Sequence, residues 1–142
     1  MKKLFVIIAV LALALTSCDH GNINGGRYFG TFQNQLNGLR EAGSLSFKYV
    51  NEEGNIYFLM NNLVPMTQVA ENKYAGIAEG NTLKDLLETM PAIDSVQVCE
   101  APEAIRLMEV DAEFLGNSVK TNMTFTTTTE NIVNVEFVGY YE

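Results

Sequence analysis

The sequence is poor in the residues on which most catalytic and metal sites depend. Its 142 residues include one histidine, two cysteines and no tryptophan. The histidine, His20, stands two positions after Cys18 in a polar, glycine-rich segment, without the rigid surroundings that a catalytic imidazole needs. We therefore expect neither a Ser-His-Asp or Cys-His nucleophile nor a zinc site. No glycine-rich loop follows a strand to hold phosphate, and the sequence predicts no cofactor.

Basic residues are also few, and the whole chain carries a formal charge of −8. Once Lys2 and Lys3 are removed with the leader described below, seven basic residues stand against 17 acidic ones, for a charge of −10. Phosphate groups repel such a domain, so nucleic acid is not an expected partner. An anionic membrane surface should repel it as well, which leaves a lipid as the expected membrane contact.

The apolar run that opens the chain is too short to cross a bilayer as a helix. It extends from Leu4 to Leu15, directly after Met1-Lys2-Lys3. A spanning helix needs roughly 20 such residues, and this run has 12. A short basic region, an apolar stretch and small residues before a cleavage point form a secretory signal peptide. Residues 1–17 are therefore expected to be removed on export.

The end of this leader carries a specific motif. Leu15-Thr16-Ser17-Cys18 resembles the lipobox of bacterial lipoproteins, in which the cysteine thiol is acylated and the chain is cut just before it. The resemblance implies that Cys18 is lipidated and that its acyl chains, such as palmitate, anchor the protein to a membrane. Several acyl chains hold stably where one is marginal, because each buried methylene contributes about 0.8 kcal/mol. We expect a place in the bacterial cell envelope, outside the cytoplasm, on the outer rather than the inner membrane.

The mature chain divides into a tether and one domain. Residues 18–25 are predicted to be the lipidated N-terminus and a flexible, glycine-rich tether. Residues 26–142 suffice for one domain with a real core but not for two. Its lone thiol, Cys99, ends the strand-like sequence Val96-Gln97-Val98-Cys99, which predicts a buried cysteine that behaves as a small hydrophobic residue.

Alternation of apolar and polar residues dominates this domain. Residues 45–49 and 56–60 form a predicted hairpin around the turn Glu52-Glu53-Gly54-Asn55. Residues 119–126 and 133–138 form a second pair around Glu130-Asn131, and the threonine run at 126–129 is the end of the first of these strands. For residues 103–115 a helical start stays open, but the second half is predicted to be a strand.

One stretch follows helical spacing instead. Leu83, Leu86, Leu87 and Met90 recur at helix intervals, Thr82 and Asp85 have the spacing of a capping box, and Pro91 ends the run. The fold class is therefore all-β, with about eight short strands and one short helix. A small antiparallel up-and-down barrel is favoured over a sandwich because closure removes exposed strand edges.

Short segments spread along the domain resemble calycin-like barrels, the group that includes lipocalins, and in particular the calycin-like lipoprotein domains of Bacteroides-type bacteria. They are Gly26 to Phe32 at the start, Asn62 to Met66 with Lys73 to Gly76 in the middle, and Asn134 to Gly139 at the end. The resemblance implies an up-and-down barrel and no established activity. It concerns the broad fold, because Tyr28 replaces the usual tryptophan and no basic residue follows Lys120.

Two sets of residues are candidates for a site. Aromatic side chains could line a cavity in a barrel mouth and bind an apolar or sugar ligand, or could simply fill the barrel. This set is Tyr28, Phe47, Tyr49, Tyr57, Phe58, Phe125 and Phe137. The carboxylates Glu109, Asp111 and Glu113 share one face of a predicted strand, where a solvated acidic face competes with a weak calcium site or a glycosidase pair.

From these observations we expect a non-catalytic, lipid-anchored binding or interaction module of the cell envelope. Its target is a small apolar ligand or an envelope protein, and the sequence does not choose between them. Two alternatives stay open: a carboxylate-dependent enzyme acting on an envelope or extracellular glycan, and a purely structural envelope protein.

Overall fold

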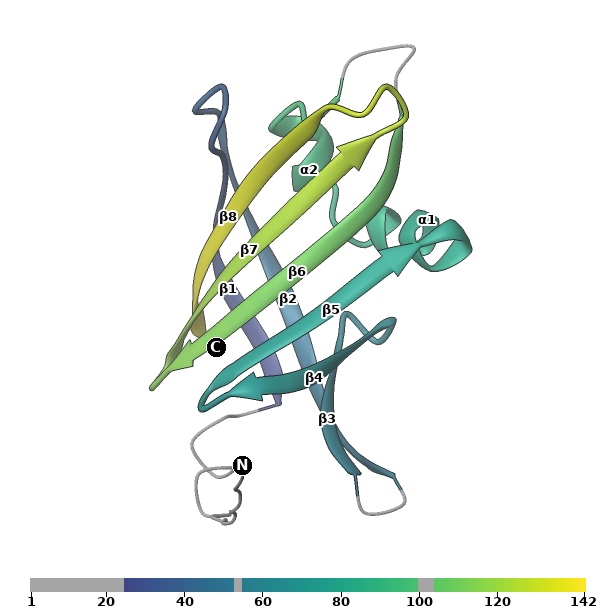
Figure 1. The fold of residues 1–142 in the computed structure, drawn as a ribbon. Helices are drawn as coiled ribbons and strands as arrows, with labels where there is room; N and C mark the ends of the chain where they lie inside the picture. Colours follow the sequence, from purple (N-terminus) through teal and green to yellow (C-terminus); the bar gives the residue numbers. More distant parts are fainter. Residues whose placement is uncertain (1–24, 53–54, 100–103) are drawn as a thin grey trace.

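The computed structural model describes residues 25–52, 55–99 and 104–142, and their strands close into one antiparallel barrel (Figure 1). Each strand pairs with the next along the chain, and the last pairs with the first. The all-β, up-and-down barrel of eight strands is thus confirmed. The strands are β1 (Gly26–Asn34), β2 (Arg40–Glu52), β3 (Asn55–Met60), β4 (Val64–Ala70), β5 (Lys73–Glu79), β6 (Ile105–Leu115), β7 (Ser118–Thr127) and β8 (Ile132–Tyr141).

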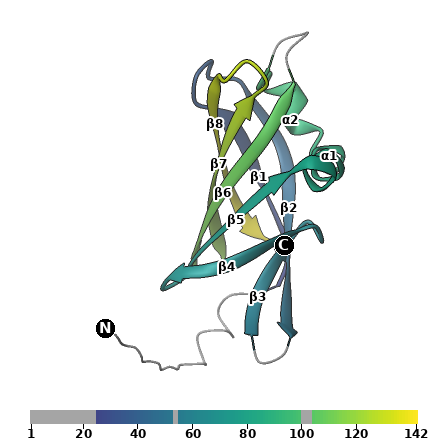
Figure 2. The same cartoon turned by 45° about the vertical axis from the view of Figure 1, so that its right-hand side comes forward.

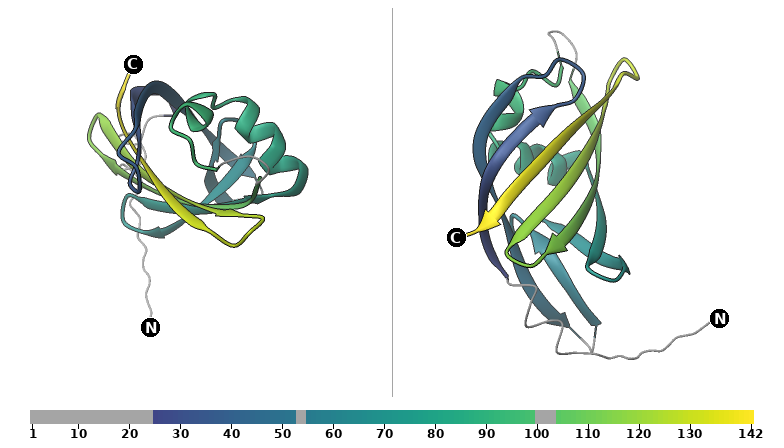
Figure 3. Two further views of the ribbon diagram at one scale, coloured as in Figure 1. Left: turned by 90° about the horizontal axis from the view of Figure 1, so that it is seen from above. Right: turned by 90° about the vertical axis from the view of Figure 1, so that its left-hand side faces the viewer.

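Two helices, α1 (Gly80–Glu88) and α2 (Ala92–Ser95), connect β5 to β6 and lie at one end of the barrel (Figures 1 and 2). We call this the helix end. Helix α1 packs on β5 and β6, and α2 packs on β2. The two helices together therefore connect β2 to β5, which are separated in the sheet by the short strands β3 and β4. The start of β1 and the end of β8 lie together at the opposite end, which we call the termini end (Figure 3).

The strands form because their side chains alternate between the barrel interior and its outer face. In β6, Met108, Val110, Ala112 and Phe114 are buried, and the acidic residues between them face outward. The predicted alternation in β7 and β8 holds in the same way. For residues 103–115 the structure removes the helical alternative from Ile105 onward, since β6 begins there.

Three of the sequence-based details are wrong at the helix end. Val96–Cys99 is not a strand: it follows α2, Gln97 has a φ of 55°, and Cys99 is half-buried rather than fully buried. Thr82 and Asp85 form no capping box, because α1 begins at Gly80, where φ is 62°, and Glu79 at its N-cap makes no side-chain capping bond. A second short helix, α2, follows Pro91, where only one helix was expected.

A net of side-chain hydrogen bonds holds the helix end to the barrel. The buried side chain of Asn34, at the end of β1, donates to the carbonyl oxygens of Val96 at 2.9 Å and Gln97 at 3.4 Å. Its own oxygen accepts from the backbone N–H of Leu36 at 2.9 Å. Asn61, in the turn between β3 and β4, donates to the hydroxyl of Thr89 after α1 at 2.9 Å. The helices are therefore fixed to the β1–β2 and β3–β4 turns.

Candidate functional site

Aromatic rings fill the interior of the barrel toward the termini end. The cluster is Tyr28, Phe47, Phe58, Tyr74 and Phe114, and each of these side chains is 2% exposed or less. Phe114 is its centre, with ring centroids 5.1 Å from Phe47 and 5.2 Å from Phe58. The first contact is edge-to-face and the second is stacked, and such ring pairs contribute about 0.5–1.5 kcal/mol each beyond the burial of apolar area. These rings pack against one another rather than around an open space between them.

The structure brings together only part of the aromatic set predicted from the sequence. Tyr28, Phe47 and Phe58 belong to the cluster, and the half-buried Tyr49 packs on Phe58 at 5.5 Å. Phe125 and Phe137 are buried elsewhere in the barrel, and Phe137 packs on Phe32 at 4.6 Å. Tyr57 lies in β3, but its side chain is outside the described residues.

Three buried rings of the barrel were missing from that set: Phe32, Tyr74 and Phe114. Their positions carried a usable signal. Phe32 follows Tyr28 by four residues in one strand and so faces the same side, and Phe114 continues the alternation of Met108, Val110 and Ala112. Tyr74 stands in a short strand with little alternation around it.

Two phenol groups of the cluster are held in their neutral form. The pKa of Tyr28 is raised to about 12, mainly by burial and to a smaller extent by the nearby Tyr141. The pKa of Tyr74 is also raised to about 12, mainly by burial and to a smaller extent by the nearby Tyr49. The tyrosines therefore lie in two neighbouring pairs, Tyr28 with Tyr141 and Tyr74 with Tyr49.

One buried polar group of the described residues lacks a hydrogen-bond partner. It is the hydroxyl of Thr121 in β7, a residue that is 0% exposed and faces the interior between Ala112 of β6 and Phe137 of β8. A buried polar group without a partner costs about 1–3 kcal/mol. Within the described residues, this hydroxyl is therefore a buried polar group that a donor or acceptor of a bound molecule would satisfy.

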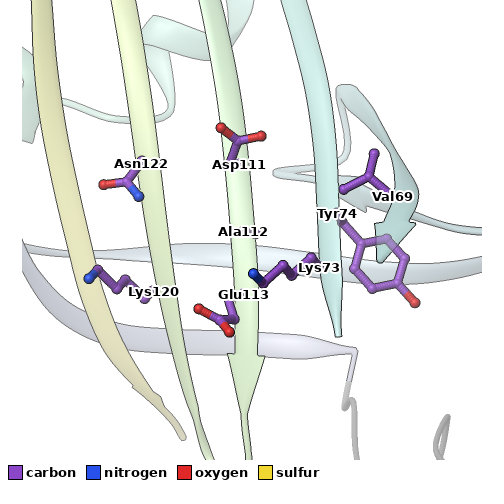
Figure 4. Close-up of a pocket in the computed structure, with 8 residues that line it drawn as sticks. All are labelled: Val69, Lys73, Tyr74, Asp111, Ala112, Glu113, Lys120 and Asn122. Carbon is purple, nitrogen blue, oxygen red and sulfur yellow. The ribbon is translucent and has the colours of Figure 1, made fainter. Parts of the chain in front are cut away.

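The predicted acidic row lies on the outer face of β6. Glu109 and Asp111 are exposed and Glu113 is half-buried. Two surface hollows, of about 280 Å³ and about 540 Å³, meet at Asp111. Figure 4 shows the smaller one, in which the carboxylate of Glu113 lies between the amino groups of Lys73 and Lys120.

This row has the chemistry of a mixed polar surface. Lys73 and Lys120 stand opposite Glu113 on the neighbouring strands, and Asn122 stands opposite Asp111. Among the described residues, no three His, Cys, Asp or Glu side chains come together where they could hold a metal ion. The three carboxylates follow one strand, whereas a glycosidase pair must face each other across the scissile bond.

Residues 18–24, with Cys18, lie outside the described residues. Neither helix of the described part has the length and hydrophobicity that crossing a bilayer would require. The sequence matches no protein-family model, and no curated protein or solved structure is significantly similar to it. The eight-stranded closed barrel itself is compatible with a calycin-like fold.

Proposed function

We propose that this chain is a calycin-like lipoprotein of the Bacteroides type, a non-catalytic binding module anchored to the cell envelope through lipid on Cys18. Its leader, its lipobox-like motif and its closed barrel support this together. The observation on which the choice of binding surface depends is the packed aromatic cluster. Because the protein's own rings occupy the interior toward the termini end, we expect a partner to bind on the outer surface of the barrel. An envelope protein is therefore the favoured partner.

A second candidate function is favoured by the unpartnered hydroxyl of Thr121. A barrel of eight strands is just wide enough to be filled by side chains or to hold one small ligand. A small apolar molecule with one polar group would satisfy Thr121 if nearby rings moved aside. Met123, two residues along β7 on the same inward face, is a flexible side chain that adapts to such a guest.

The enzymatic and structural alternatives have less support. An enzyme acting on a glycan would need two carboxyl groups that converge in a pocket, and the acidic row of β6 runs along one outer face. A purely structural role gives no use to the unpartnered hydroxyl of Thr121. Neither alternative explains more of the molecule than a binding module does.

Native mass spectrometry of the protein purified gently from its own host separates the two candidates. A mass equal to the protein alone supports a filled barrel and an envelope-protein partner, which crosslinking in intact cells would then capture. An added mass of a few hundred daltons that is lost on denaturation, and absent from a Thr121→Val variant, supports the small-ligand carrier. Hydrolysis of an envelope glycan that is lost in Glu109→Gln or Asp111→Asn would overturn the non-catalytic proposal.

A further inference from the structure

A row of exposed apolar side chains crosses the outer wall of the barrel at the termini end. Phe29 in β1 stands opposite Tyr140 in β8, Tyr140 stands opposite Ser118 in β7, and Ser118 stands opposite Leu115 in β6. Phe29, Tyr140 and Leu115 are 47%, 64% and 54% exposed. We call these three residues the rim patch. Their positions in one cross-strand row make them a band rather than scattered surface residues.

The charged side chains around the rim patch are paired with charges of the opposite sign. The guanidinium of Arg27 lies 4.9 Å from the centroid of the Phe29 ring, on the side toward the start of the chain. That guanidinium also pairs with the carboxylate of Glu142 at 2.9 Å. On the other side, Lys120 follows Ser118 by two residues on the same outward face of β7 and pairs with Glu136 at 3.4 Å. Aromatic rings beside charges that are already paired suit the boundary between lipid and water.

The path of the chain places this end of the barrel next to the proposed anchor. Gly25 directly precedes β1, and its carbonyl oxygen lies 3.5 Å from the hydroxyl of Tyr141 in β8. The seven residues from Cys18 to Asn24 reach about 25 Å at most, at roughly 3.5 Å per residue. The 11 residues of β6 extend over about 35 Å, at roughly 3.3 Å each. The tether is therefore shorter than the barrel is long, and it favours the termini end as the end nearest the membrane.

We infer that the rim patch is a membrane-docking surface, on which the barrel rests against the lipid that holds its N-terminus. This inference depends on the proposed anchor at Cys18. The anchor fixes the distance to the membrane, and the rim patch fixes the orientation of the barrel. The helix end, with its acidic residues Asp85, Glu88 and Asp94, then points away from the membrane toward a partner.

The chain offers a matched control at the opposite end. Leu36, Leu39 and Ile132 are 79%, 40% and 64% exposed and lie at the turns of the helix end. Ile132 has the same exposure as Tyr140. Because the sequence has no tryptophan, Tyr140→Trp and Ile132→Trp each introduce a single reporter, at two equally exposed sites on opposite ends.

The experiment uses the full chain, exported and lipidated by a bacterial host, in vesicles of phosphatidylcholine with or without bromine on the acyl chains. Emission from Tyr140→Trp should shift to shorter wavelength and be quenched severalfold more by brominated lipid than emission from Ile132→Trp. Adding Phe29→Ser and Leu115→Ser to the Tyr140→Trp chain should remove most of that quenching. Both reporter sites are on the surface, and unchanged thermal unfolding shows that the variants fold.

The outcomes separate this inference from the anchor on which it depends. If the chain floats with vesicles but the two reporters are quenched equally, the anchor stands and the docking surface is wrong. If the Tyr140→Trp emission shifts without quenching by bromine, the patch is covered by protein, and the docking surface is again wrong. If the chain does not float with vesicles, both the anchor and the docking surface fail.

Discussion

The ring of Phe32 lies 4.6 Å, centroid to centroid, from the ring of Phe137, and each ring occupies space that a glycine leaves free. A Cβ at Gly43 would stand 2.7 Å from the ring of Phe32, and one at Gly139 would stand 2.6 Å from the ring of Phe137. Gly43 and Gly139 both pair with Gly30 of β1. Strands β2 and β8, on either side of β1, thus carry glycine where the two large rings lie inside the barrel.

Gly139→Ala is expected to destabilise the protein by about 1–3 kcal/mol, because the new methyl group overpacks the interior against the Phe137 ring. Urea unfolding followed by circular dichroism measures the change. Phe137→Leu should lower the free energy of unfolding less in the Gly139→Ala protein than in the wild type, because the smaller side chain removes the clash with the new methyl group. Strict additivity of the two changes would contradict the packing described here.

Gly30→Ala should be more damaging than Gly139→Ala. Its Cβ would stand 1.8 Å from the carbonyl oxygen of Val138, a backbone atom that cannot rotate away as a ring can. We expect a loss above the range of a usual overpacking change, or failure to fold, with Ser44→Ala on the outer face of the neighbouring strand as the control. A Gly30→Ala protein as stable as the control would show that β1 and β8 are further apart than described.

Truncation of Phe114 tests the aromatic cluster. Phe114→Ala removes a ring that contacts Tyr28, Phe47, Phe58 and Tyr74, and a buried Phe→Ala change costs about 3–5 kcal/mol. Phe29→Ala, on the outer wall at 47% exposure, should cost well under half as much. If both variants unfold at the same urea concentration, the cluster is not the packed centre of this part of the barrel.

The two buried phenols predict a loss of stability at high pH. The pKa of Tyr28 and of Tyr74 rises from 10 to about 12 on folding, so folding favours the neutral phenol. That contribution is complete below pH 10 and is lost as the pH rises toward 12, by roughly 2–3 kcal/mol for each group. Unfolding free energies measured across this range should fall less in Tyr28→Phe. Phenolate absorbance from every tyrosine near pH 10 in a still-folded protein would contradict this.

Asn34 is expected to hold the helix end in place. Asn34→Ala leaves the carbonyl of Val96 with one donor fewer and removes the acceptor for Leu36, at a cost of about 1–3 kcal/mol. Asn37→Ala removes the 3.2 Å bond to Val96 and the acceptor for the exposed N–H of Leu39, and it should cost less because neither bond is fully buried. Amide hydrogen exchange should show faster opening of α2 in Asn34→Ala, and equal protection in both variants would contradict the role of Asn34.

The barrel could be predicted from the sequence because its strands alternate cleanly. Where one face of a strand is buried, as in β6 to β8, the period of two fixes both the strand and its inward side chains. The turn around Glu130-Asn131 joins two such strands and was placed correctly. Closure itself followed from the number of strands and the advantage of leaving no edges.

The errors fall where local preference yields to tertiary contacts. Val96 and Val98 are typical strand residues. The side chain of Asn34 at the end of β1, however, donates to the carbonyl oxygens of Val96 and Gln97 and so stabilises a turn there. Thr82 and Asp85 have the spacing of a capping box, but the helix begins two residues earlier, at Gly80, which has a positive φ. The aromatic set missed Tyr74 because the short strand β5 alternates little, whereas the spacing of Phe32 and the alternation that leads to Phe114 could have added both.

The most direct test is the intact mass of the protein extracted with detergent from the envelope of its own host. The anchored binding module predicts a chain that begins at Cys18 and carries the added mass of acyl groups, whereas a Cys18→Ser variant should lose that mass and leave the membrane fraction. An unmodified mass for the wild-type chain, with the protein released without detergent, would contradict the anchor and the function proposed from it.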